Sequence, residues 1–139
     1  MCGRFTSSQR REAIGERFEV AVPETYQHRF NLAPQQRTLI IRELDDEREA
    51  VMAKWGLLPH WAKDTKIAFK MINARAETLT EKPAYRGLLG RHRCLIPADG
   101  FYEWTLGRDG KKPLPASTRA NSVRNDDSGL LSPDDALAA

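Results

Sequence analysis

Alternation of apolar and polar residues predicts a β-hairpin in the middle of the chain and a second pair of strands near residue 100. The hairpin comprises strands over residues 38–43 and 49–55, with an Asp-Asp-Glu turn between them. The second pair is expected over residues 91–96 and 101–106, joined by the Pro-Ala-Asp-Gly turn at 97–100. Strands therefore account for most of the regular structure.

Helical spacing is confined to short segments. Residues 9–20 contain an apolar pair one turn apart and follow serines that can cap a helix, so a short amphipathic helix is expected there. Residues 76–79 and 84–89 resemble single helical turns, and residues 28–34 are expected to be irregular because Asn and Pro interrupt them. Many short strands with few short helices indicate a mainly β, α+β single domain.

The pattern disappears after Pro113. Residues 114–139 contain no aromatic residue and no alternation, and they are rich in Ser, Ala, Asp, Asn and Pro. Such a composition is typical of disorder, so we expect a body of residues 1–113, without a strand after Pro113, followed by a disordered tail.

Composition places the chain among soluble globular proteins. Its 139 residues are 40% hydrophobic and 29% charged, enough for one domain with a core. No apolar run approaches a membrane span and no signal peptide is evident, so we expect a cytoplasmic protein with reduced cysteines. The net charge is +3, but residues 114–139 hold two basic and four acidic residues, which leaves the body more basic than the whole. A basic body favours phosphate-bearing partners.

The second residue is the first candidate for chemistry. Cys2 lies between Met1 and Gly3, so removal of Met1 would expose an amine and a thiol on one residue. The amine, whose pKa is typically about 8, condenses with an aldehyde, and the thiol then closes a thiazolidine ring. The alternative is a cysteine that occupies this position by chance.

Glu103 is a candidate acid–base group. In a strand, Phe101 and Glu103 share one face, and large aromatic neighbours would partly desolvate the carboxylate and raise its pKa towards a range useful for proton transfer. The alternative is a glutamate on an edge strand that faces water.

Asn73 and Arg75 are candidates for binding an oxygen and a phosphate. On a strand the two side chains would point to the same side, where the amide can donate or accept and the guanidinium can form paired hydrogen bonds with a phosphate. The alternative is a turn asparagine beside a solvated arginine.

Aromatic and basic residues elsewhere suggest contacts with nucleic acid. Trp55, Pro59 and Trp61 are interleaved with cations, an arrangement that can stack on unpaired bases. The alternative is a core Trp55 and a packing role for Trp61, and for Trp55 this alternative is favoured. Arg86 and the basic run at 91–93 form either a phosphate-facing patch or a solvated edge. The cysteines and histidines lack metal-ligand spacing, so no metal is expected.

Five segments of the chain resemble one known family in content and order. They are MCGRF at residues 1–5, NLAP at 31–34, WGLLPHWAKD at 55–64, INARAET at 72–78 and CLIPADGFYEW at 94–104. On these segments the sequence resembles the SOS-response-associated peptidase (SRAP) family, whose members are abasic-site processing proteins.

The resemblance implies a mainly β SRAP-like fold and action on single-stranded DNA with abasic sites, without a metal or organic cofactor. It implies that Cys2, freed by autoproteolytic removal of Met1, forms a thiazolidine crosslink with the ring-opened abasic site. Other implied roles are an acid–base group at Glu103, an amine or sugar contact at Asn73, phosphate contacts at Arg4 and Arg75, and stacking by Trp55, Pro59 and Trp61.

The sequence also departs from the family. A histidine that the family carries in its C-terminal half has no counterpart, and residues 114–139 match nothing in the pattern, so we expect a domain that is incomplete at its C-terminus through truncation or a frameshift. The alternatives are a non-catalytic DNA-binding fragment and a thiol peptidase that uses Cys2. We further expect a monomer that acts at damaged DNA of the nucleoid.

Overall fold

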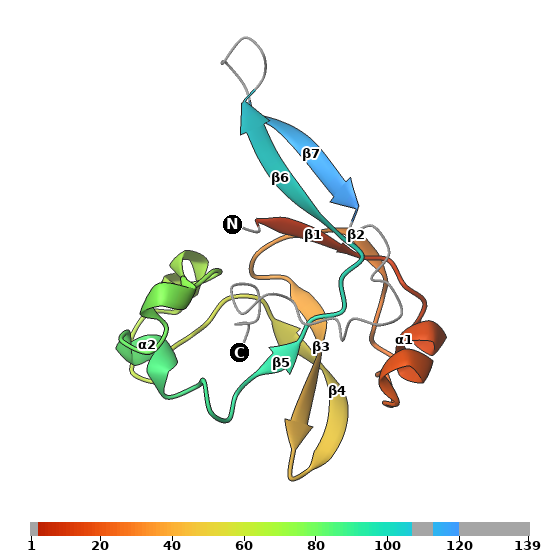
Figure 1. Cartoon of the computed structure of the whole chain (residues 1–139), viewed down its shortest axis with the longest axis horizontal. Helices are drawn as coiled ribbons and strands as arrows, with labels where there is room; N and C mark the ends of the chain where they lie inside the picture. The colour runs from red at the N-terminus through yellow and green to blue at the C-terminus, as the bar shows by residue number, and fades with distance from the viewer. Residues whose placement is uncertain (1–2, 107–112, 120–139) are drawn as a thin grey trace.

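Two small antiparallel sheets and a few short helices make up the chain (Figure 1). The computed structural model describes residues 3–106 and 113–119, with the backbone alone from residue 103 onward. The predicted mainly β, α+β class is confirmed.

The three-stranded sheet has the order β4-β3-β5 and contains the predicted central hairpin. Strands β3 (Arg37–Leu44) and β4 (Glu47–Lys54) pair along their whole length. Their two-residue turn places Asp45 and Asp46 at φ of 52° and 63°, the left-handed pair that matches the twist of a hairpin and that aspartate tolerates. Strand β5 covers only Cys94–Leu95, shorter than the strand predicted over 91–96.

The four-stranded sheet has the order β2-β1-β6-β7. Strand β1 (Arg4–Ser7) lies between β2 (Arg29–Leu32) and β6 (Gly100–Leu106). The prediction that residues 28–34 are irregular is therefore wrong for β2. This edge strand buries only Leu32 and so shows no alternation in the sequence.

The absence of a strand after Pro113 was also a wrong expectation. Strand β7 (Pro113–Arg119) pairs with β6 over seven residues, and the two strands extend together away from the rest of the body (Figure 1). Pairing of backbones needs no apolar side chains, and an edge strand tolerates the prolines at 113 and 115. The predicted disorder beyond residue 119 lies outside the described residues.

Helix α1 (Arg11–Phe18) forms where the sequence predicts it but begins differently. Its N-cap is Arg10, and no side chain caps it, so the expected serine cap is wrong. Ser8 instead donates its hydrogen bonds to Asp99. Ile14 on this helix is fully buried and packs with Leu39, Ile41 and Ala50 of the central hairpin, and this apolar contact stabilises the helix.

Short helical turns occupy the segment that connects β4 to β5. They are the 3₁₀ helices η1 (Thr65–Lys70) and η2 (Ala76–Thr78) and the single-turn helix α2 (Pro83–Arg86), of which the last two agree with the predicted turns. Leu57, Leu79 and Tyr85 form the buried cluster that holds this segment together.

A second buried cluster joins the sheets. Phe5 of β1, Leu32 of β2 and Trp55 at the end of β4 pack together, with Ile72 and Ile96 against them. The segment before Asn73 and the strand that begins at Arg4 therefore share one core.

Candidate functional site

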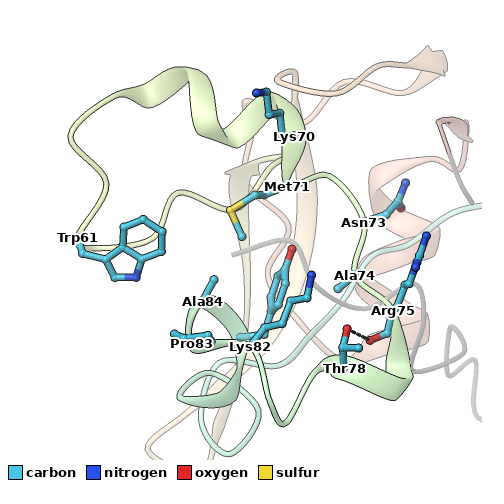
Figure 2. Close-up of a pocket in the computed structure, with 11 residues that line it drawn as sticks. Trp61, Lys70, Met71, Asn73, Ala74, Arg75, Thr78, Lys82, Pro83 and Ala84 are labelled. Atoms are coloured by element: carbon cyan, nitrogen blue, oxygen red, sulfur yellow. Dashed lines mark hydrogen bonds between the residues drawn. The ribbon is translucent and has the colours of Figure 1, made fainter.

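An open pocket of about 830 Å³ lies over the helical segment (Figure 2). Its described lining includes three cations, Lys70, Arg75 and Lys82, and no carboxylate. All three cations are exposed to solvent. A concave surface with this charge favours anionic ligands. Lys70 and Lys82 were not identified from the sequence, where isolated lysines carry no distinguishing pattern.

Asn73 and Arg75 both line this pocket, and Figure 2 shows them at the same end. They lie in a loop between η1 and η2 rather than in the strand that their predicted geometry assumed. Arg75 is nevertheless extended, with φ −97° and ψ 128°, and is exposed, whereas Asn73 is partly buried. Both residues therefore line one pocket, from a loop and not from the predicted strand.

Two hydrogen bonds fix the backbone immediately before Asn73. The amide of Leu57 donates to the carbonyl of Met71 at 3.0 Å, and Nε1 of Trp55 donates to the carbonyl of Ile72 at 3.0 Å. The position of the loop therefore depends on the segment that follows β4.

Trp55 is a core residue. Its side chain is 5% exposed, and its ring packs on Phe5 with centroids 5.2 Å apart. Pro59 is also buried. Neither side chain can stack on a base in this arrangement. The expected stacking by Trp55 and Pro59 is therefore wrong, and Trp55 is the core residue that the alternative described. The physical reason is that a large apolar ring beside a sheet is more stable when it is buried in the core than when it is exposed to solvent.

Gly56 makes the turn that leads from β4 into the loop. Its φ is +129°, a conformation that L side chains rarely adopt. A Cβ there would also meet the side chain of Gln35 and would come within 2.8 Å of the Ala68 carbonyl oxygen. Only glycine allows the close approach of these segments.

Trp61 remains available for stacking. It is 51% exposed and lies at the end of the pocket opposite Asn73 and Arg75 (Figure 2). Phe69, nearby in the sequence, is 62% exposed. Arg86 is exposed at the end of α2 but is not part of the pocket lining. The pocket therefore combines one exposed indole with three cations.

Arg4 connects β1 to the NLAP segment. Its Nη1 donates a hydrogen bond to Oδ1 of Asn31 at 3.0 Å. On β6, Tyr102 pairs with Arg4 and donates its hydroxyl to the carbonyl of Phe30 at 2.8 Å. Asn31, which the sequence indicated as a break in regular structure and as the start of the NLAP segment, is thus a partner of a candidate site residue.

Cys2 and the side chain of Glu103 lie outside the described residues. The backbone of Glu103 directly follows Tyr102, which pairs with Arg4.

Asp99 forms a polar cluster at the other end of the β1–β6 pair. Its carboxylate accepts hydrogen bonds from Thr6 Oγ1 at 2.6 Å and from both the amide and the hydroxyl of Ser8. Burial alone would raise the pKa of Asp99, but these hydrogen bonds outweigh it and hold the pKa below its ordinary value. The sequence identified residue 99 only as part of a turn.

The part of the chain that the structure describes contains neither a cluster of metal-ligating side chains nor a membrane-spanning helix. No group of three or more His, Cys, Asp or Glu side chains there could hold a metal ion. No helix among the same residues is long and apolar enough to cross a bilayer.

Comparison with known proteins agrees with this arrangement. The family model described as SOS response associated peptidase (SRAP) matches residues 1–128. The abasic site processing protein YoaM of Bacillus subtilis is 46% identical over 125 residues, covering 88% of this chain and 55% of that protein. The abasic site processing protein HMCES of Xenopus tropicalis is 35% identical over 102 residues, covering 65% of this chain and 30% of that protein.

Solved structures show the same fold. An X-ray structure of a protein from Bacteroides thetaiotaomicron matches with a TM-score of 0.69 and 25% identity, over 82% of this chain and 52% of that one. A phage-related protein of Bordetella bronchiseptica matches with a TM-score of 0.64 and 29% identity, and the match covers 84% of this chain and 53% of that one.

The chain spans about half the length of the Bacillus relative, and the family match covers the residues that line the pocket and form the two sheets. On the match over residues 1–128, the chain belongs to the SOS response associated peptidase (SRAP) family.

Proposed function

We propose that this protein processes abasic sites in single-stranded DNA by forming a covalent crosslink through Cys2. The observation that carries the proposal is the cationic pocket, whose described lining has Asn73 and Arg75 at one end, Trp61 at the other and no acidic residue. The relatives named as abasic site processing proteins support the same substrate.

The pocket offers what a single strand requires. Lys70, Arg75 and Lys82 can neutralise phosphates, and the exposed Trp61 can stack on an unpaired base. Single-stranded DNA is favoured over duplex because a stacking platform needs a base that is not already paired. Arg4 lies on β1 of the four-stranded sheet and donates a hydrogen bond to Asn31 of β2. It is the proposed phosphate contact that is nearest to Cys2 in the sequence.

The proposed reaction begins after removal of Met1, which we propose is autoproteolytic. The free α-amine of Cys2 attacks the aldehyde of the ring-opened abasic sugar, and loss of one water gives an imine. The Cys2 thiolate then adds to the imine carbon, and the nitrogen takes up a proton, which closes the thiazolidine ring. No electrons are gained or lost, so no redox partner is required.

Glu103 is the proposed acid–base group for these steps, and Asn73 is the proposed contact for the reacting amine or a sugar oxygen. A carboxyl group can protonate the departing water and accept the proton of the attacking thiol. Arg4 lies at the start of β1 and Asn73 in the loop before η2, and their neighbours Phe5 and Ile72 pack in one cluster with Leu32 and Trp55.

A denaturing gel tests the proposal. The protein is incubated with single-stranded DNA that carries one abasic site, beside Cys2→Ala and Glu103→Gln variants and undamaged DNA. A heat-stable shifted band that requires both Cys2 and the lesion is expected. Binding without any such band, by a folded protein that has lost Met1, would instead indicate a non-catalytic DNA-binding protein.

A further inference from the structure

The pairing between β1 and β6 is short. It consists of three residue pairs, from Thr6 with Gly100 to Arg4 with Tyr102. On its other side β1 pairs with β2, and there the register shifts between Phe5 and Ser7. So short a ladder beside an irregular one specifies register weakly, and a slip of one residue would move every side chain to the other face.

A side-chain cluster strengthens this pairing. We call it the Asp99 clasp, which comprises Asp99, Thr6 and Ser8. The Asp99 carboxylate accepts from both neighbours, and the Asp99 amide donates to the Thr6 carbonyl at 3.0 Å. Thr6 and Ser8 lie more than ninety residues before Asp99 in the chain, so these contacts join the first strand to the start of β6.

Resting on the proposed function, we infer that Asp99 is a positioning residue for the crosslinking reaction. The clasp fixes the register of β1 against β6, and that register places Arg4, two residues after Cys2 in the sequence, opposite Tyr102, one residue before Glu103. Asp99 is four strand residues before Glu103, a separation of about 13 Å, so it acts through β1 and β6 and not on the reacting atoms.

The chain supplies a matched control at the same end of β1. The hydroxyl of Tyr26 lies 3.2 Å from Ser7 Oγ and donates to the carbonyl of Gln9 at 2.9 Å. These contacts join β1 to the core beneath α1 and not to β6. Tyr26→Phe therefore loosens the same segment without altering the link between the two strands.

Three measurements test the role of Asp99. The first is the rate of crosslinking to single-stranded DNA with an abasic site, and the second is the affinity for the same DNA with a non-reactive tetrahydrofuran analogue. The third is the rate at which the N-terminal cysteine reacts with free glyoxylate, an aldehyde that needs no positioning. Folding is checked by circular dichroism.

We expect Asp99→Ala to lower the crosslinking rate on the order of tenfold or more, since small misplacements of reacting groups are costly. Its affinity for the analogue and its glyoxylate rate should match the wild type. Asp99→Asn should recover part of the rate, and Tyr26→Phe should leave it unchanged. If Asp99→Ala does not fold, Ser8→Ala, which removes one donor of the clasp, should show a smaller decrease of the same kind.

Two results would overturn the inference. One is an Asp99→Ala or Ser8→Ala protein that crosslinks at the wild-type rate, and the other is a loss of affinity that accounts for the whole loss of rate. Failure of the proposed function looks different, because the wild-type protein itself would then form no crosslink.

Discussion

Nε1 of Trp55 donates a hydrogen bond to the carbonyl of Ile72 at 3.0 Å, so a buried indole at the end of β4 holds the residue that immediately precedes Asn73. The same ring packs on Phe5, which follows Arg4. One side chain thereby links the pocket loop to the strand that begins the chain. The two sheets and the site are consequently parts of one packed unit.

This relationship predicts opposite effects for two tryptophans. Trp55→Ala should lower the free energy of unfolding by about 3–5 kcal/mol, because it removes a buried ring. Trp61→Ala should change it by less than about 0.5 kcal/mol, because the ring is half exposed. Trp61→Ala should instead weaken binding of single-stranded DNA by about 1–3 kcal/mol.

Urea denaturation and fluorescence anisotropy with an abasic-analogue strand measure the two quantities separately. A Trp61→Ala protein that binds DNA as tightly as the wild type would contradict the stacking role. A Trp55→Ala protein of unchanged stability would contradict the core assignment.

The cations of the pocket should determine how binding depends on salt. Each of Lys70→Ala, Arg75→Ala and Lys82→Ala should reduce the slope of log K against log salt concentration by about 0.7, the value for one phosphate contact on a single strand. Arg42→Ala is the control, because Arg42 lies on β3 and is paired with Glu49 at 2.7 Å. Unchanged slopes for all three pocket variants would place the DNA elsewhere.

The lowered pKa of Asp99 predicts acid sensitivity. Because the folded-state pKa lies below the unfolded value, the ionised carboxylate stabilises the fold at neutral pH, and that contribution is lost as the pH falls below about 3.8 through the folded pKa. The difference in unfolding free energy between wild type and Asp99→Asn should therefore be largest at neutral pH and shrink in acid. A difference that stays constant down to the most acidic pH would contradict this assignment.

Two glycines provide a test of the loop geometry. Gly56→Ala should destabilise the fold by about 1–3 kcal/mol or more, because φ is +129° and the new Cβ would meet neighbouring atoms. Gly87→Ala is the matched control, since Gly87 has a helical backbone and nothing lies within 4 Å of the added carbon. It should be neutral or slightly stabilising. Thermal unfolding of both variants distinguishes them, and equal effects would argue against the strained turn.

Patterns that reflect burial could be predicted from the sequence. The central hairpin could be predicted because its apolar residues are buried, with Leu39 and Ile41 of β3 and Ala50 of β4 packed with Ile14 of α1. Strands β2 and β7 could not be predicted, because both are edge strands held mainly by backbone pairing. The Asp99 clasp was also missed, since its partners are distant in sequence and Ser8 instead resembled a helix cap.

Intact mass spectrometry of the product tests the central claim most directly. Protein that lacks Met1, incubated with an abasic single strand, should gain the mass of the strand less one water. The gain should be absent in Cys2→Ala, and treatment with borohydride should leave it unchanged, because a closed thiazolidine contains no imine to reduce. A product of equal yield with Cys2→Ala, or one that gains two hydrogens on reduction, would contradict a thiazolidine at Cys2.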